Sequence, residues 1–212
     1  LNIGVVGDLG TGKTQLVKYL IASLRSASAE VQEEPLDILV FDYKRDYGDP
    51  EFLRTVGGEV LAPHKIPLNF FALPEGSGTL QRMRKIGTFF DVLEKIYGGL
   101  GPKQRLNLSE VIRRRYDEDY PNPPTLERIL ADYREEYSAD SVASILYRMV
   151  SLEMFADGKD DAKAFPDLIK GKVLVLNLSE LGTDQDAKNV LVVLFLNLYY
   201  DYMNGLKKWG YV

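Results

Sequence analysis

Runs of apolar residues separated by turn residues divide the chain into alternating strands and helices. The short apolar run Leu1–Val6, interrupted by Gly4, predicts a buried strand. In Thr14–Leu24 the apolar residues recur at helical spacing, which predicts a helix with one apolar face. The polar segment Arg25–Pro35 predicts a linker, and Asp37–Asp42 predicts a second buried strand. Strand, helix and strand in this order predict a βαβ unit in a parallel sheet covered by helices on both faces.

Beyond Pro74 the apolar pattern becomes helical. The spacing predicts four successive helices, separated by turn residues, at Leu80–Tyr97, Leu108–Tyr116, Thr125–Tyr137 and Ser141–Phe155. Thr125 and Asp140 stand where N-caps are expected, because their side chains can accept hydrogen bonds from the free N–H groups of the first helical turn. This part of the chain is therefore predicted to be a mostly helical insert.

Strand character returns after the insert. Lys172–Leu178 predicts a buried strand, and Asp186–Lys208 predicts a long helix whose centre is apolar on all sides. The predicted fold class is α/β with a mainly parallel sheet. We expect the first part of the α/β core over residues 1–73, the helical insert over residues 74–165, and the rest of the core over residues 166–212.

Composition removes several classes of function. The chain of 212 residues has no cysteine and one histidine, which excludes disulfides, thiolate metal sites and zinc sites with two histidine ligands. The lack of cysteine favours an intracellular, cytoplasmic protein. The longest apolar run, Val190–Leu196, is far shorter than the ~20 residues that span a bilayer, so we expect no membrane insertion. A net charge of −5 disfavours general nucleic-acid binding, although it leaves room for local basic loops.

The strongest chemical signal is the segment Gly7–Thr14, which matches G-x-x-x-x-G-K-[ST] between a predicted strand and a predicted helix. Its glycines let backbone N–H groups point inward around phosphate oxygens, and the helix N-terminus adds partial positive charge. Lys13 is expected to reach the β- and γ-phosphates of ATP, and the Thr14 hydroxyl to bind Mg²⁺. The predicted nucleotide contacts are Gly7, Asp8, Leu9, Gly10, Thr11, Gly12, Lys13, Thr14 and Gln15.

Two aspartates follow the second predicted strand. Asp42 closes that strand, where P-loop proteins present a carboxylate toward Mg²⁺ or the attacking water; the alternative is that it caps a turn. Asp46 lies in a loop that could approach the same site, or it could be a solvated charge. We therefore take Lys13, Asp42 and Asp46 as candidate catalytic residues, and Thr14 and Asp42 as candidate metal ligands.

Motifs along nearly the whole chain resemble the HerA/FtsK superfamily of ring-forming motor ATPases, which includes secretion and conjugation ATPases. The resemblance rests on the P-loop, on Asp42–Tyr47 (DYKRDY), on the stretch Pro67–Leu73 (PLNFFAL), and on Gly171–Leu181 (GKVLVLNLSEL). Phe70 and Asn177 depart from the proline and aspartate usual there. The resemblance implies a RecA-like P-loop core that hydrolyses ATP with Mg²⁺ to drive a DNA translocase or helicase.

The resemblance also sets expectations about assembly. It implies a homo-oligomeric ring, most often hexameric, that acts on DNA. The details around Asp42–Leu73 are most similar to the DptH ATPases of phosphorothioation-dependent DNA restriction systems, which implies restriction or translocation subunits as partners. In the family a strand ending in Asp-Glu, the Walker B strand, follows the long helix. We therefore expect this chain to be a fragment that lacks Walker B and the arginine finger, and to turn ATP over slowly or not at all.

Basic clusters and rival functions remain open. Arg113–Arg115, with Lys103 and Arg105, could contact DNA or a neighbouring subunit's nucleotide, or could form an ordinary solvated helix face. Other classes compatible with the P-loop are a phosphotransferase with the insert as a lid and a non-catalytic, nucleotide-gated assembly module. A protein-export ATPase is a further alternative within the superfamily.

Overall fold

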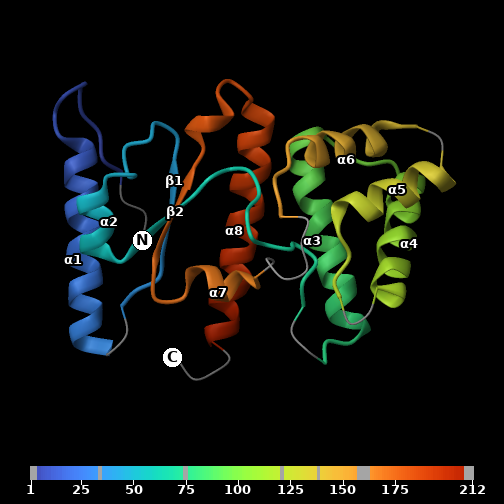
Figure 1. The fold of residues 1–212 in the computed structure, drawn as a ribbon, viewed down its shortest axis with the longest axis horizontal. Coiled ribbons are helices and arrows are strands. Elements are labelled where there is room, and N and C mark those ends of the chain that lie inside the picture. The colour runs from blue at the N-terminus through green and yellow to red at the C-terminus, as the bar shows by residue number, and fades with distance from the viewer. Residues whose placement is uncertain are drawn as a thin grey trace. The chain divides into compact units, whose positions relative to one another are not determined.

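The computed structural model describes residues 4–32, 35–73, 76–119, 122–137, 139–156 and 163–207. Its elements, in chain order, are α1 (Lys13–Gln32), β1 (Ile38–Asp42), α2 (Pro50–Val56), β2 (Gly58–Leu61), α3 (Thr79–Tyr97), α4 (Pro102–Glu118), α5 (Leu126–Glu136), α6 (Ser141–Ser151), α7 (Phe165–Ile169), β3 (Val173–Asn177), the 3₁₀ turn η1 (Ser179–Leu181) and α8 (Gln185–Lys207) (Figure 1). None of the helices in these ranges combines the length and apolarity needed to cross a membrane.

The chain forms two compact units. The first comprises Leu1–Ala62 and Pro166–Gly182, and the second comprises Pro63–Phe165 and Thr183–Val212. The cut after residue 165 coincides with the predicted end of the insert. The sequence placed the long C-terminal helix with the α/β core, whereas the structure groups α8 with the helices, where it packs on α3.

A three-stranded parallel sheet with the order β1-β3-β2 forms the centre of the first unit. The central strand β3 is buried along its whole length, as its apolar sequence VLVLN requires. The register pairs Asp42 of β1 with Asn177 of β3, so the carboxyl ends of these strands meet at one edge. The predicted parallel sheet is confirmed.

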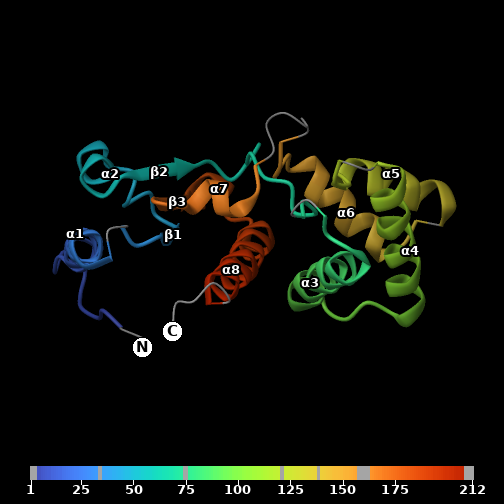
Figure 2. The same cartoon turned by 90° about the horizontal axis from the view of Figure 1, so that it is seen from below.

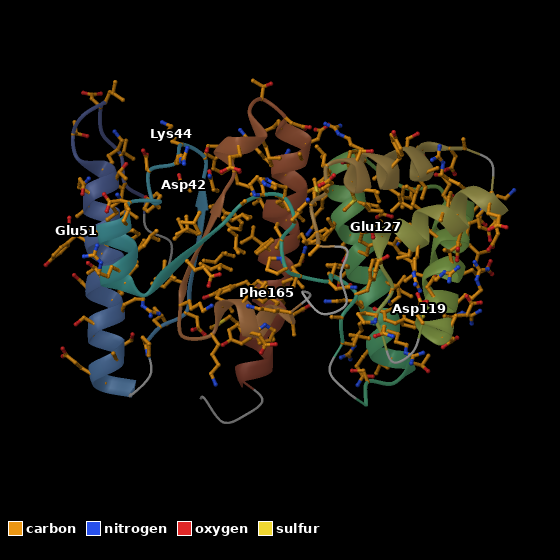
Figure 3. All side chains as sticks on the ribbon, in the orientation of Figure 1. Asp42, Lys44, Glu51, Asp119, Glu127 and Phe165 are labelled. Carbon is orange, nitrogen blue, oxygen red and sulfur yellow. The ribbon has the colours of Figure 1, made fainter. Side chains whose placement is uncertain are left out.

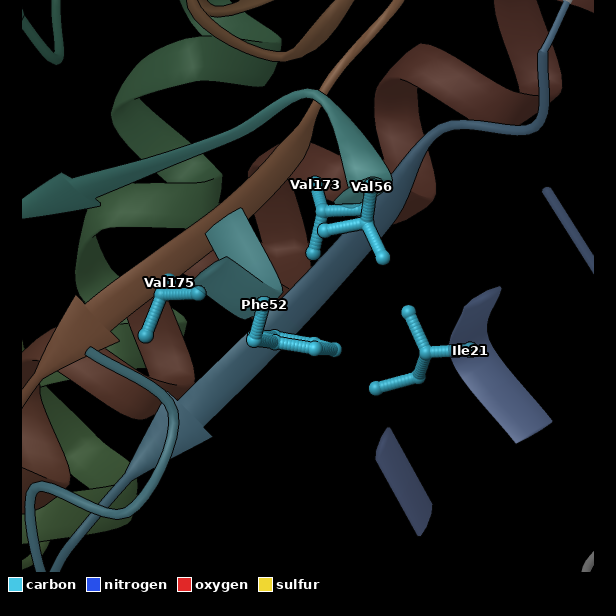
Figure 4. Packing of buried hydrophobic residues seen from close by; sticks show 5 residues of the cluster. All are labelled: Ile21, Phe52, Val56, Val173 and Val175. Atoms are coloured by element: carbon cyan, nitrogen blue, oxygen red, sulfur yellow. The ribbon is translucent and has the colours of Figure 1, made fainter. Parts of the chain in front are cut away.

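Helices α1 and α2 cover one face of this sheet. Ile21 of α1 and Phe52 and Val56 of α2 pack against Val173 and Val175 of β3 (Figure 4). The packing exploits the period of each element, because alternate residues of β3 point to the same face.

Helix α2 has a defined cap at each end. The Asp49 carboxylate accepts hydrogen bonds from the N–H groups of Glu51 and Phe52, and Gly57 ends the helix at a φ of 61°. The hydrogen bond from Phe52 holds the pKa of Asp49 below its ordinary value.

Arg25 fastens α1 to the amino ends of two strands. Its guanidinium donates to the carbonyl of Leu36, before β1, at 2.5 Å, and to that of Gly171, before β3, at 2.9 Å. Arg25 is only 8% exposed, and burial lowers the pKa of its guanidinium, which the nearby Asp37 partly offsets. Arg25 therefore has a structural role, although the sequence predicts it as the first residue of a polar linker.

The second unit is built from helices packed in succession: α3 on α4, α4 on α5 and α5 on α6 (Figure 2). An aromatic cluster joins Phe70 and Phe71 to Phe89 of α3, and the Tyr116 hydroxyl of α4 donates to the Phe71 carbonyl. The predicted N-caps are confirmed, because Thr125 accepts from the N–H of Arg128 and Asp140 from that of Ala143.

Several sequence expectations need correction. Residues 4–6 of the expected first strand are not in a strand, and residues 1–3 lie outside the described ranges. Helix α1 continues through Arg25 to Gln32, because that segment holds no proline or glycine to stop it. Elements α2 and β2 were missed: Pro50 marks a helix start that was overlooked, and Gly58–Leu61 is too short to show a pattern.

The apolar face predicted for α1 is only partly buried. Ile21 is 8% exposed, whereas Leu16 and Leu24, on the same predicted face, are 48% and 55% exposed. The helix therefore uses the Val17 and Ile21 side for packing on the sheet within this unit.

Replacing Arg25 by methionine should destabilise the first unit by about 2 kcal/mol, because two backbone carbonyls lose their donors. The matched control is Arg54→Met, an exposed arginine of α2, which should change stability by less than about 0.5 kcal/mol. Urea denaturation followed by circular dichroism compares the two variants. Equal stabilities would show that the two hydrogen bonds contribute nothing.

Candidate functional site

The phosphate-loop sequence forms a turn that leads directly into α1. Gly10 and Gly12 have φ angles of 81° and 82°, the left-handed region that glycine adopts without steric cost. The Thr11 hydroxyl donates to the Asp8 carbonyl at 2.8 Å and closes the turn. A Cβ on Gly7 would lie 2.7 Å from the Thr11 hydroxyl oxygen, so any larger residue there would disturb the loop. The glycines of the motif are therefore needed for this geometry.

Lys13 folds its side chain back over the turn. Its Nζ donates to the carbonyls of Gly7 and Asp8, each at 2.5 Å. The ammonium thus lies above the loop, close to the helix N-terminus. The surrounding loop residues are exposed, so an anion can reach it from solvent.

The donors of this loop fit a polyphosphate. Lys13, Thr14 and Gln15 occupy the first turn of α1, where the N–H groups have no acceptor within the helix. The helix dipole, these free N–H groups and the Lys13 ammonium together favour negative charge. Neither Gly10 nor Gly12 has an atom within 4 Å of an added Cβ, which leaves open space beside the turn.

Asp42 ends β1 with its carboxylate turned into the following loop (Figure 3). Oδ1 accepts from the N–H groups of Lys44 at 3.2 Å and Asp46 at 3.0 Å, and Oδ2 accepts from that of Tyr47 at 2.8 Å. The residue is 2% exposed. The carboxylate therefore fixes the course of the loop 43–47.

The same loop brings Asp46 to the phosphate loop. The Thr14 hydroxyl donates to Asp46 Oδ2 at 3.4 Å, a long and weak hydrogen bond. Arg45, just before Asp46, has a φ of 63°, which is uncommon for a residue other than glycine. Burial, followed by the charges of Asp42 and Asp46, raises the pKa of Tyr47.

Asn177 organises the neighbouring strand end. Its side-chain oxygen accepts from the N–H of Ser179 at 3.1 Å and from the Ser179 hydroxyl at 2.6 Å, and its amide nitrogen donates to Glu180. Because Asn177 pairs in register with Asp42, two polar side chains shape adjacent loops at one edge of the sheet.

The structure thus brings together part of the predicted site. Lys13, Thr14 and Asp46 lie together at the N-terminus of α1. Asp42 is buried at the end of β1, and its carboxylate oxygens accept hydrogen bonds from the N–H groups of the loop. Among the described residues, no group of three or more metal-binding side chains occurs. The roles of Arg45 and Asn177 were missed, because they depend on backbone conformation and strand register that the sequence does not display.

Three arginines of the predicted basic patch on α4 form ion pairs within the second unit. Asp132 of α5 accepts from Arg114 at 2.9 Å and from Arg115 at 2.5 Å. Hydrogen bonds from Arg115 and Arg114 hold the pKa of Asp132 below its ordinary value. Arg115 also pairs with Glu118, and Arg105 with Glu94. These ion pairs favour the structural interpretation for Arg105, Arg114 and Arg115.

Asp132→Asn should destabilise the second unit by about 2 kcal/mol at pH 7, because it leaves two arginines without their shared carboxylate. The folded-state pKa of Asp132 is depressed, so its stabilisation is present above about pH 4 and lost as the pH falls further. The difference between wild type and variant should shrink accordingly in acid. Exposed Glu135→Gln on the same helix is the control; an equal effect of both variants in urea melts would contradict the assignment.

The chain is similar to a known family and to a solved structure. A family model described as the central domain of the helicase HerA matches residues 2–198. A search of the curated proteins returns no match. Among solved structures the chain is similar to VirB4 of Thermoanaerobacter pseudethanolicus, with 17% sequence identity and a TM-score of 0.60. The match covers 95% of this chain and 56% of that one, and it shows a shared fold.

Proposed function

Because the chain belongs to the family of the HerA helicase central domain, a family of P-loop ATPases, we propose that it binds and hydrolyses ATP as part of a motor. The observation that carries the proposal is the placement of the Lys13 ammonium over a glycine turn at the N-terminus of a 20-residue helix. Such an arrangement is matched to a chain of phosphates in both charge and shape.

Each residue of the loop has a distinct part in binding. The N–H groups of the turn and of the first turn of α1 donate to phosphate oxygens. Lys13 releases the carbonyls of Gly7 and Asp8 and neutralises charge on the β- and γ-phosphates. The Thr14 hydroxyl would bind the Mg²⁺ that accompanies the nucleotide. Mg²⁺ supplies further neutralisation of the phosphate charge when it accompanies the nucleotide.

The motor we propose acts on DNA, works as a ring of identical subunits and is of the DptH type of restriction ATPase. Support for DNA comes from the helicase family. Because Arg114 and Arg115 are held by Asp132, DNA contacts would depend on basic residues outside this pair, such as the exposed Arg84 and Arg113.

Protein export is the second candidate, because the fold is shared with VirB4. The two functions differ in the substrate that stimulates ATP turnover, which is DNA for the first and an exported protein for the second. A phosphotransferase would instead transfer phosphate to a small acceptor, and an assembly module would oligomerise with ATP without hydrolysis.

Replacing Lys13 by alanine should weaken ATP binding at least tenfold, because the ammonium is the main positive charge at the loop. Titration with a fluorescent ATP analogue measures the affinity, with Lys18→Ala, five residues further along α1, as the control. Unchanged affinity in Lys13→Ala would exclude the P-loop as the nucleotide site.

Double-stranded DNA should raise the rate of phosphate release by the full-length protein severalfold if it is a DNA motor. Stimulation should weaken as salt rises, because DNA binding releases counterions. Phosphate release measured with DNA, with a small metabolite mixture and with neither separates the candidates. Indifference to DNA would favour protein export or one of the other classes.

A further inference from the structure

We propose that the two aspartates of the loop after β1 have separate tasks. Asp46 provides the carboxylate on the Mg²⁺ side of the phosphate loop, and Asp42 is a positioning residue that holds Asp46 there. The inference rests on the proposed function, since it concerns the metal that accompanies the nucleotide. The sequence suggests Asp42 as a metal ligand because it closes a strand, and this inference gives it a different role.

The carboxylate of Asp42 is already committed to the protein. Three backbone N–H groups, those of Lys44, Asp46 and Tyr47, occupy three of the roughly four lone-pair positions of a carboxylate. Mg²⁺ keeps several of its water molecules and so needs open space around it. A residue that is 2% exposed offers little such space.

Asp46 has the opposite properties. It is exposed, and its Oδ2 lies 3.4 Å from the Thr14 hydroxyl oxygen. Adjacent ligands on an octahedral Mg²⁺, each at 2.0–2.1 Å, are about 2.9 Å apart. The two oxygens are therefore about 0.5 Å further apart than adjacent ligands of one ion, so a small movement of either side chain would let both bind it. A hydroxyl and a carboxylate are both oxygen donors that Mg²⁺ prefers.

The position of Asp46 depends on Asp42 through the backbone. The N–H of Asp46 and that of Tyr47, the next residue, both donate to the Asp42 carboxylate. This course of the chain requires the left-handed conformation of Arg45. Beyond Asp46 the loop is anchored by the Tyr47 ring, whose centroid lies 6.1 Å from that of Phe52.

Nucleotide affinity measured with Mg²⁺ and again with EDTA tests the assignment, with the ratio of the two affinities as the readout. Asp46→Asn should lower this ratio roughly tenfold while the affinity in EDTA stays the same. Asp42→Asn should lower the ratio in the same direction, because an amide nitrogen cannot accept the bonds that a carboxylate oxygen accepts. The double variant should match Asp46→Asn alone.

A control separates this effect from simple loss of stability. Asp49→Ala removes a carboxylate that also accepts two backbone N–H groups in the same unit, at the cap of α2. It should lower the melting temperature and leave the Mg²⁺ ratio unchanged.

A second pair of variants tests positioning without touching either carboxylate. Arg45→Gly and Arg45→Val both remove an exposed guanidinium, but only glycine accepts a φ of 63° readily. The glycine variant should retain the Mg²⁺ ratio of the wild type, and the valine variant should lose a large part of it.

Three results would overturn the inference: an unchanged ratio in Asp46→Asn, a further loss when Asp42→Asn is added to it, or equal ratios in the two Arg45 variants. The second result would identify Asp42 as an independent ligand. If the wild-type protein binds no nucleotide, either with Mg²⁺ or in EDTA, the proposed function itself is refuted.

Discussion

The buried carboxylate of Asp42 is the interaction on which the geometry of the candidate site depends. A charge taken out of water needs compensation, and here it comes from three amides of the chain that follows. The same bonds that satisfy the charge also bend the loop back toward the N-terminus of α1. At this strand end the same three hydrogen bonds therefore offset the desolvation of the carboxylate and fix the conformation of the loop.

The parallel pairing of β1 with β3 places the Asp42 loop beside the loop that follows β3. The register of β1 on β3 brings Asp42 beside Asn177, which satisfies its own loop with both ends of its amide. At the other end of the strands, Arg25 binds the segments before β1 and β3 to α1. The helix that carries the phosphate loop is thus fastened to the sheet at the edge opposite the site.

Contiguous motifs could be predicted from the sequence, whereas features set by distant partners could not. The caps at Thr125 and Asp140 were predicted correctly because the residues involved are neighbours in the chain. For the same reason the segment Gly7–Thr14 could be recognised as a glycine-rich turn before a helix, and its role in binding phosphate stays a prediction. The partner of Arg114 and Arg115 is Asp132 on the next helix, so the sequence suggested a basic surface where the fold has ion pairs. The sequence predicts both Asp42 and Asp46 as site residues, but only the path of the backbone distinguishes what each contacts.

The two hydrogen bonds that the Lys13 ammonium donates to backbone carbonyls bear on which anions could bind the loop. An incoming anion must compete with the loop for the ammonium, and carbonyl oxygens carry only partial negative charge. A small monovalent ion such as chloride would gain little from that exchange, whereas a polyphosphate could replace both carbonyls and also accept from the free N–H groups of the first helical turn. A ligand would therefore have to offer at least two acceptor oxygens to replace the hydrogen bonds that the loop already provides for Lys13.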